Sequence, residues 1–203
     1  MGVAIRVPAT VPRLARDALD YARELHRGQR REVDGAPFMA HPREVARLLH
    51  ASGAPDHLVA AGFLHDVIEK TPATAFDLRR RFGSTVAALV LAVSEDESIH
   101  GYAKRKGALR HQVADAGEEA LLLFAADKIS KARELHLELA SPSGRASRSA
   151  RRRLAYYRRC LALLQDRLAH SPLVDQLDAE LADLPERRRG RGAHRSDGQG
   201  GQT

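Results

Sequence analysis

The chain has 203 residues, of which 43% are hydrophobic and 4% aromatic, and its formal net charge is +7. This length and apolar content are typical of one core-forming domain and exclude a wholly disordered chain. No apolar run is long enough to cross a bilayer and the first residues lack the features of a secretory signal, so we expect a cytoplasmic protein without membrane contact.

The positive charge is concentrated in two regions. Residues 145–159 hold seven arginines and no acid, and residues 186–203 hold five arginines against two acids. Together these regions carry more positive charge than the whole chain, so the remainder is net acidic. General nucleic-acid binding is therefore not expected. A basic run without an aromatic stacking platform is more often a solvated face or the contact for an acidic partner.

The N-terminal half is predicted to be helical. Apolar spacing predicts a first helix from about Pro12 to His26, and the glycines and charges of GQRREVDGAPF predict a loop after it. Four more helices are expected over residues 42–49, from Asp56 until Thr71 and Pro72, over residues 76–82 ending at Gly83, and over residues 85–93.

The C-terminal half continues in the same way. Helices are expected over residues 102–116, 118–139, 148–169 and 172–184, with Gly117 separating the first two and SPSG forming a loop before the third. The tail over residues 185–203 has too little apolar surface to order itself. We find no strand and no repeat, so the prediction is an all-α single domain over residues 1–184, followed by a disordered basic tail over residues 185–203.

Two histidines and two aspartates stand out as candidate metal ligands. His65 and Asp66 are adjacent in the apolar stretch AAGFLHDVIEKT, His41 begins a helix in FMAHP, and Asp127 lies inside LLLFAADKI. A buried carboxylate needs a counter-charge, and a cation would suffice. The alternative is an aspartate turned to solvent beside a core histidine. Nitrogen and oxygen ligands without thiolate suit manganese, iron or zinc with open positions, and the single cysteine, Cys160, excludes a cysteine-rich site.

The sequence resembles the HD-domain phosphohydrolases, and more closely the hydrolase domain of the bacterial RelA/SpoT enzymes and the small stand-alone alarmone hydrolases. The motifs that carry the resemblance are YARELHRGQRR, PFMAHPREVA, AAGFLHDVIEKT, RRFGSTVAALV, YAKRKG and FAADKISKARELH. The resemblance implies an HD-domain helical bundle in which His41, His65, Asp66 and Asp127 bind Mn²⁺. It also implies removal of pyrophosphate from the 3′ position of (p)ppGpp, and stand-alone members are implicated in dephosphorylating NADPH.

Further residues are candidates for catalysis and substrate binding. Glu69 follows His65 by four residues and Asp66 by three, so on a helix it faces the same side and can orient a water or accept its proton. Its alternative role is a solvated glutamate at the helix end. By resemblance Arg31 packs against the guanine base, Lys104 and Lys106 lie near the phosphates, and Tyr156 lies near the nucleotide. The alternative for each is an ordinary loop or helix-surface position.

The sequence departs from the family pattern at three positions. Lys70 stands where relatives have aspartate, Lys131 where they have asparagine, and Glu32 where they have lysine. The first two changes make the pocket about three charge units more positive. One hypothesis is hydrolysis with altered substrate recognition, in which Lys70 and Lys131 grip anionic oxygens. The other is a catalytically weak or inactive nucleotide-binding module, in which the lysines repel the metal.

Overall fold

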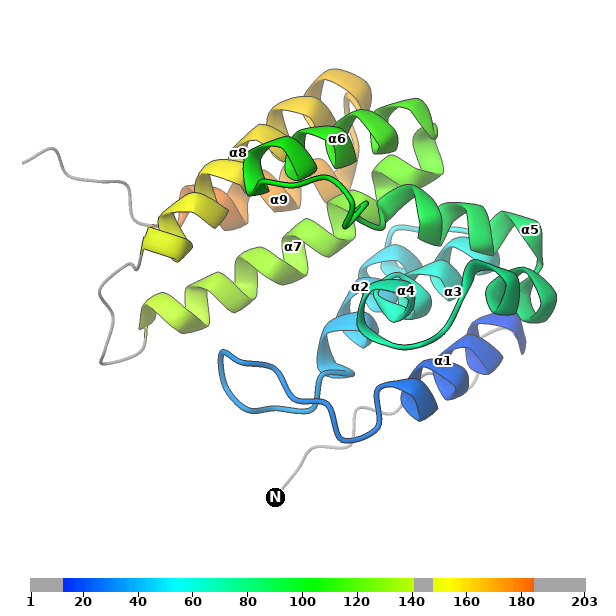
Figure 1. Ribbon diagram of the computed structural model, residues 1–203. Helices are drawn as coiled ribbons and strands as arrows, with labels where there is room; N and C mark the ends of the chain where they lie inside the picture. Colours follow the sequence, from blue (N-terminus) through cyan, green and yellow to red (C-terminus); the bar gives the residue numbers. More distant parts are fainter. Residues whose placement is uncertain (1–12, 141–147, 185–203) are drawn as a thin grey trace, which may run out of the picture.

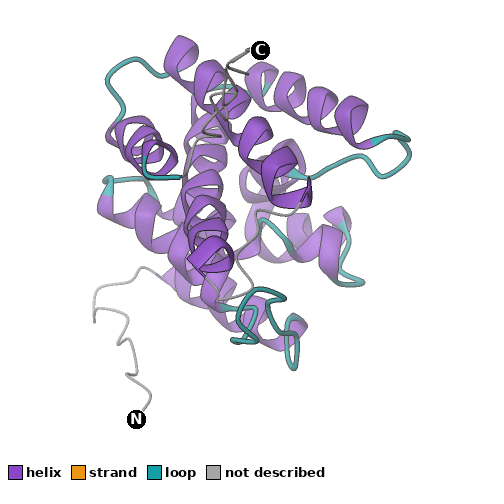
Figure 2. Ribbon diagram, turned by 90° about the vertical axis from the view of Figure 1, so that its left-hand side faces the viewer, coloured by secondary structure: helices purple, strands orange, loops and turns teal. Residues whose placement is uncertain are grey.

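The computed structural model describes residues 13–140 and 148–184. Within these ranges the elements are helices, joined by turns and loops (Figure 2). They are α1 (Arg13–Leu25), α2 (Ala40–Ala51), α3 (Asp56–Leu64), α4 (Val67–Lys70), α5 (Ala75–Val93), α6 (Tyr102–Asp115), α7 (Glu118–Ala140), α8 (Arg148–Arg167) and α9 (Pro172–Ala182). The predicted all-α fold is confirmed; among the described residues the β-type pairing is one isolated bridge between Arg30 and Pro37.

Helix α7 is the central element of the bundle. It packs against α2, α3, α5, α6, α8 and α9 and lies between a group formed by α1 to α5 and a group formed by α6, α8 and α9 (Figure 1). Its side chains Phe124, Ala125 and Ile129 are fully buried, as the apolar run LLLFAADKI predicts. Because the middle of α7 is buried, Asp127, Lys128 and Ser130 on it must find partners inside the protein.

The helix breaks follow the local sequence. Gly83 interrupts α5 with a φ of 87°, where the sequence predicts the end of one helix and the start of the next. Gly117, with a φ of 95°, separates α6 from α7 as expected. Both positions are in the left-handed region that favours glycine. The predictions for Pro12, the SPSG loop and the tail over residues 185–203 lie outside the described residues.

One helix prediction is wrong. The helix expected from Asp56 to Thr71 is divided into α3 and α4, with a turn at His65 and Asp66. The ring N–H of His65 donates to the carbonyl of Gly62, three residues earlier, at 2.9 Å. Such a bond competes with the backbone hydrogen bonds of a helix. The break therefore occurs at the two residues that the sequence marks as metal ligands.

Helices α2 and α3 approach closely. A Cβ atom added to Gly62 would lie 2.9 Å from Leu49 Cδ1 and 3.0 Å from Ala46 Cα, so only glycine permits this contact. The contact holds His41, at the start of α2, beside His65, at the end of α3. No helix in the described part of the chain is long and apolar enough to span a membrane.

Candidate functional site

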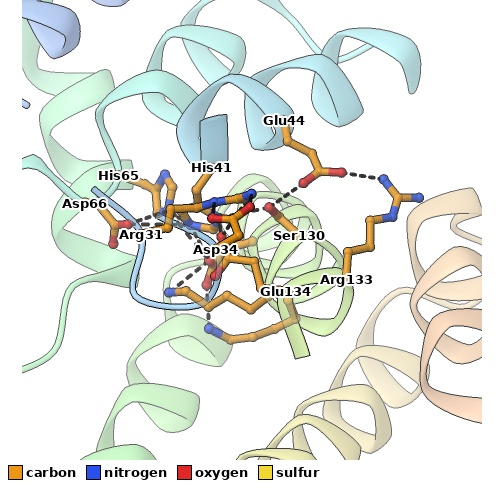
Figure 3. Close-up of polar contacts among 12 residues, drawn as sticks. Arg31, Asp34, His41, Glu44, His65, Asp66, Ser130, Arg133 and Glu134 are labelled. Carbon is orange, nitrogen blue, oxygen red and sulfur yellow. Dashed lines mark hydrogen bonds and ion pairs between the residues drawn. The ribbon is translucent and has the colours of Figure 1, made fainter. Parts of the chain in front are cut away.

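Four predicted ligands meet in the interior. His41 Nε2 lies 3.0 Å from His65 Nε2, 3.5 Å from Asp66 Oδ2 and 3.2 Å from Asp127 Oδ1. His65 Nε2 lies 3.5 Å from Asp66 Oδ2 and 3.6 Å from Asp127 Oδ1. All four side chains are buried. Residues from α2, from the turn after α3 and from α7 thus bring two nitrogens and two oxygens together. Figure 3 shows His41, His65 and Asp66 of this set side by side.

The hydrogen-bond partners of the Nδ1 atoms of His41 and His65 show that the Nε2 atoms are the ones free to bind a cation. His65 Nδ1 faces the Gly62 carbonyl, which can only accept, so Nδ1 carries the proton. His41 Nδ1 lies 2.9 Å from Ser130 Oγ, whose own proton is donated to Glu44. Ser130 therefore accepts from His41 Nδ1, and in the neutral rings both Nε2 atoms present lone pairs to the centre.

The centre has few donors for these lone pairs. Among the described residues, Asp66 Oδ2 accepts no hydrogen bond, and Asp127 Oδ1 has the ammonium group of Lys131 at 3.0 Å. Four acceptors that face one another repel unless a cation or proton lies among them. His41, His65 and Asp127 each place a ligand atom within 4.8 Å of the others, and Asp66 adds a second carboxylate. The donor set therefore fits a divalent metal ion with nitrogen and oxygen ligands.

The ionisation of the aspartates agrees with this role. Burial alone would raise the pKa of Asp66, but His65 and His41 in their protonated form, together with Lys131, hold that pKa well below its usual value. Burial opposes the ionisation of Asp127 as well, but Lys128 and Lys131 lower its pKa. Both carboxyl groups are thus anionic ligands.

Two lysines on α7 contact Asp127. Lys128 is 3% exposed, pairs with Asp127 Oδ2 and lies 4.3 Å from the centre of the Phe124 ring. Lys131 Nζ lies 3.0 Å from Asp127 Oδ1, the oxygen that faces the histidines. Lys131 therefore lies on the same face of α7 as Asp127. Lys131 also lines the neighbouring cavity, so its ammonium group lies at the boundary between the ligands and open space.

An open cavity of about 1060 Å³ begins at these ligands. His41, Asp66 and Glu69 form part of its wall. Glu69 Oε1 accepts from the backbone N–H of Glu95 at 2.6 Å. Burial raises the pKa of Glu69, which makes its carboxylate a stronger base than an exposed glutamate. Although the helix is broken at Asp66, Glu69 thus still faces the same cavity as that ligand.

Lys70 also lines this cavity, on the side of the loop between α1 and α2. Its Nζ lies 5.3 Å from the centre of the Phe38 ring, and its carbonyl accepts from Gln29 Nε2. His26 Nδ1 lies 2.9 Å from Oε1 of the same Gln29. The loop is therefore tied to the end of α4. The ammonium group of Lys70 lies over Phe38 of this loop, whereas its backbone N–H donates to the carbonyl of Asp66 at 3.1 Å.

Arg31 lies on the cavity wall but is engaged with acids. Its guanidinium pairs with Asp34 and lies 3.2 Å from Glu134 Oε1 (Figure 3). Only 13% of its side chain is exposed. A base that stacks on Arg31 would thus meet a guanidinium whose orientation these two carboxylates fix.

The opposite wall is basic and aromatic. Tyr156 is buried, and Lys106 Nζ lies 5.0 Å from the centre of its ring. Lys106 also pairs with Glu95, and both line the cavity together with Tyr102. The structure does not bring Lys104 to this wall: Lys104 is exposed and outside the set of residues that line the cavity, because it faces away from Lys106 on α6.

Part of the arginine segment packs onto the domain. Arg152 lies 4.0 Å from the centre of the Tyr102 ring, and Arg153 pairs with Glu138 and lines the cavity. Arg145 is outside the described residues. These contacts with the domain account for some of the charge that would otherwise suggest a nucleic-acid surface.

Sequence reasoning missed several residues of the site. Lys128, Ser130, Glu95 and Glu134 each contact a predicted site residue, and Glu44 contacts Ser130. Lys128 had one local signal, since it follows Asp127 directly in an apolar run. The others are 10 or more positions from the residues they contact, so no local pattern indicates them.

Comparison with known proteins agrees with this geometry. Residues 18–158 match the family model described as HD domain. The guanosine-3′,5′-bis(diphosphate) 3′-pyrophosphohydrolase MESH1 of Homo sapiens is 36% identical over 123 residues, which span 59% of this chain and 68% of that protein. The Danio rerio MESH1 is 32% identical over 123 residues, which again span 59% of this chain and 68% of that protein. The bifunctional (p)ppGpp synthase/hydrolase SpoT of Escherichia coli is 42% identical over 84 residues, but this match covers only 12% of that protein and 41% of this chain.

A solved structure extends the likeness to most of the fold. The structure of a metazoan SpoT orthologue, described as hydrolysing ppGpp and acting in starvation responses, superposes with a TM-score of 0.74. It is 26% identical, and the match covers 84% of this chain and 95% of that one. A structure of lmo0812 from Listeria monocytogenes matches with a TM-score of 0.63 at 28% identity, over 73% of this chain and 97% of that one.

Proposed function

Because this chain belongs to the HD-domain family, we propose that it is a metal-dependent hydrolase that removes pyrophosphate from the 3′ position of ppGpp. The observation that carries the proposal is the set of four lone-pair donors, two of which, His41 and Asp66, line an open cavity. His41, His65, Asp66 and Asp127 would hold the metal. Mn²⁺ is the proposed ion, since it suits nitrogen and oxygen ligands without thiolate. A cytoplasmic location stays a prediction.

A divalent ion held by these ligands supplies Lewis acidity and a water nucleophile at neutral pH. The remaining steps belong to residues of the chain. Glu69, whose orientation the Glu95 backbone fixes, accepts the proton of the attacking water. Lys131 and Lys106 face the cavity and bind the anionic oxygens of the substrate. Arg31, held by Asp34 and Glu134, offers a flat face for the guanine base.

The test is turnover of ppGpp by the purified protein with Mn²⁺, followed by ion-exchange chromatography of the nucleotide and pyrophosphate products. We expect pyrophosphate release that falls more than about 100-fold in His65→Ala, because the metal stabilises the transition state by several kcal/mol. The matched control is His50→Ala, an exposed histidine on α2 that should retain activity. Absence of turnover, or equal turnover in His65→Ala, would contradict the proposal.

One observation favours a second candidate, a nucleotide-binding module without turnover. Lys131 Nζ lies 3.0 Å from the ligand oxygen Asp127 Oδ1, so its ammonium group competes with a metal for this carboxylate. Lys131→Asn separates the two functions. If the chain is a hydrolase that uses Lys131, the variant loses substrate affinity; if Lys131 keeps the metal out, the variant gains metal binding and activity. Equilibrium dialysis with Mn²⁺ and the ppGpp assay measure both effects.

A further inference from the structure

The outer nitrogen of His41 begins a chain of hydrogen bonds that leads away from the cavity. His41 Nδ1 lies 2.9 Å from Ser130 Oγ, and Ser130 Oγ donates to Glu44 Oε2 at 2.7 Å. Arg133 donates to the other oxygen, Glu44 Oε1, at 2.7 Å and to Glu180 Oε1 at 2.6 Å. Figure 3 shows His41, Ser130, Glu44 and Arg133 in this order. The chain joins α2, α7 and α9.

The chemical nature of the groups determines which group donates each hydrogen bond in this series. Burial would raise the pKa of Glu44, but its bonds from Arg133 and Ser130 lower that pKa, so Glu44 is ionised and can only accept. The single hydroxyl proton of Ser130 therefore goes to Glu44. Ser130 Oγ is left to accept from His41 Nδ1, so the Nε2 atom of a neutral His41 carries no proton.

We propose that Glu44, acting through Ser130, is a positioning residue that fixes the tautomer of His41 in which Nε2 can bind a metal. The proposal rests on the metal centre of the proposed function and adds residues to it. Hydrogen-bonded partners behind a metal-binding histidine fix its tautomer and orientation, and their loss commonly weakens metal affinity about 10- to 100-fold. Glu44 does not line the cavity at the metal centre.

No other described acceptor takes over this role. Glu134 Oε1 lies 3.8 Å from His41 Nδ1, beyond hydrogen-bond distance, and accepts from Arg31 NH1 at 3.2 Å. Ser130 is fully buried, so bulk water does not replace its hydroxyl. The tautomer of His41 therefore depends on the Ser130 and Glu44 pair.

The variant Glu44→Gln should reverse the donor and acceptor roles in the hydrogen bonds between residue 44, Ser130 and His41. Arg133 donates at Oε1 and so keeps the amide oxygen of the glutamine on its own side. The amide NH₂ then faces Ser130 and donates to Oγ, which turns the hydroxyl proton toward His41 Nδ1. His41 must respond by carrying its proton on Nε2, where it blocks the metal position. Ser130→Ala removes the preference of His41 for a proton on Nδ1 without reversing it, so the change in the tautomer of His41 should be smaller than in Glu44→Gln.

Two measurements test this inference. Long-range ¹H–¹⁵N NMR of the metal-free protein in mildly alkaline solution reports which nitrogen of His41 carries the proton. We expect Nδ1–H in the wild type, a mixture in Ser130→Ala and Nε2–H in Glu44→Gln. Titration calorimetry with Mn²⁺ should show affinity weakened about 10- to 100-fold in Ser130→Ala and at least as much in Glu44→Gln.

Ser52→Ala is the matched control. Ser52 lies at the end of α2, and its hydroxyl donates to Leu49 O at 2.8 Å, so the variant loses a comparable bond away from His41. It should keep the wild-type tautomer and Mn²⁺ affinity. Wild-type signals for His41 in Glu44→Gln, or an unchanged affinity in both site variants, would overturn the inference. The NMR result does not require turnover of ppGpp, so failure of the proposed substrate leaves this test intact.

Discussion

Gly62→Ala tests whether the close contact of α2 and α3 builds the metal centre. The new Cβ would lie 2.9 Å from Leu49 Cδ1, a flexible side-chain end, but also 3.0 Å from Ala46 Cα and 3.2 Å from Ala46 N. Ordinary Cβ contacts begin near 3.4 Å, so the backbone of α2 must move by a few tenths of an ångström. Because backbone atoms cannot yield as a side chain does, the two helices must separate.

The expected cost can be estimated from two opposing effects. Overpacking of a core costs about 1–3 kcal/mol, and contact with backbone places this variant near the upper end. Alanine gains about 1 kcal/mol over glycine in a helix. The free energy of unfolding should therefore fall by about 2 kcal/mol, or about 4–8 °C in Tm for a chain of this size.

Gly107→Ala is the matched control, since Gly107 lies within α6 and a Cβ there meets no atom within 4 Å. It should raise the free energy of unfolding by up to about 1 kcal/mol. Urea unfolding of both variants, with an unchanged m-value, gives the comparison. Separation of α2 and α3 should also weaken Mn²⁺ binding in Gly62→Ala, because His41 and His65 move apart. Equal stability of the two variants would refute the packing argument.

Three further predictions concern the cap of α5, an ion pair and the metal. Thr74→Ala removes the capping box in which Thr74 and Asp77 satisfy each other's backbone N–H groups, so it should lower the free energy of unfolding by about 1 kcal/mol. Thr85→Ala, at an exposed site inside α5, should not lower it. Urea melts of both variants measure the difference. Burial opposes the ionisation of Glu95, but Lys106 and Arg105 lower its pKa below the ordinary value near 4.5. Relative to Glu95→Gln, the wild-type protein should therefore be more stable above about pH 4.5, and this difference in the free energy of unfolding should disappear as the pH falls through the folded-state pKa of Glu95. A stability difference that instead grows in acid would contradict this sign. Addition of a chelator to protein saturated 100-fold above its Mn²⁺ Kd should lower stability by about 2.7 kcal/mol in thermal melts, and Asp127→Ala should show no such response.

Local sequence patterns account for most of the fold. Apolar spacing predicts α1, α2 and the helices from α5 to α9, and glycines at residues 83 and 117 mark breaks because their φ values are positive. The break at His65 is not predictable in the same way. It accompanies a bond from the His65 ring to the backbone of Gly62, and an apolar run does not encode the rotamer that makes this bond.

For the candidate site as well, the local sequence determines some features and the tertiary structure determines the others. The chain itself determines which groups are available: two imidazoles, two carboxylates in apolar surroundings, Glu69 after them and lysines at residues 70 and 131. Tertiary structure decides which atoms meet. Ser130 reaches His41 across 89 positions, Glu134 reaches Arg31 across 103, and Lys104 faces away while Lys106 lines the cavity. Residue type and helical period are local properties, whereas the tautomer of His41 and the partners of each charge depend on how α2, α7 and the loop before α2 pack together.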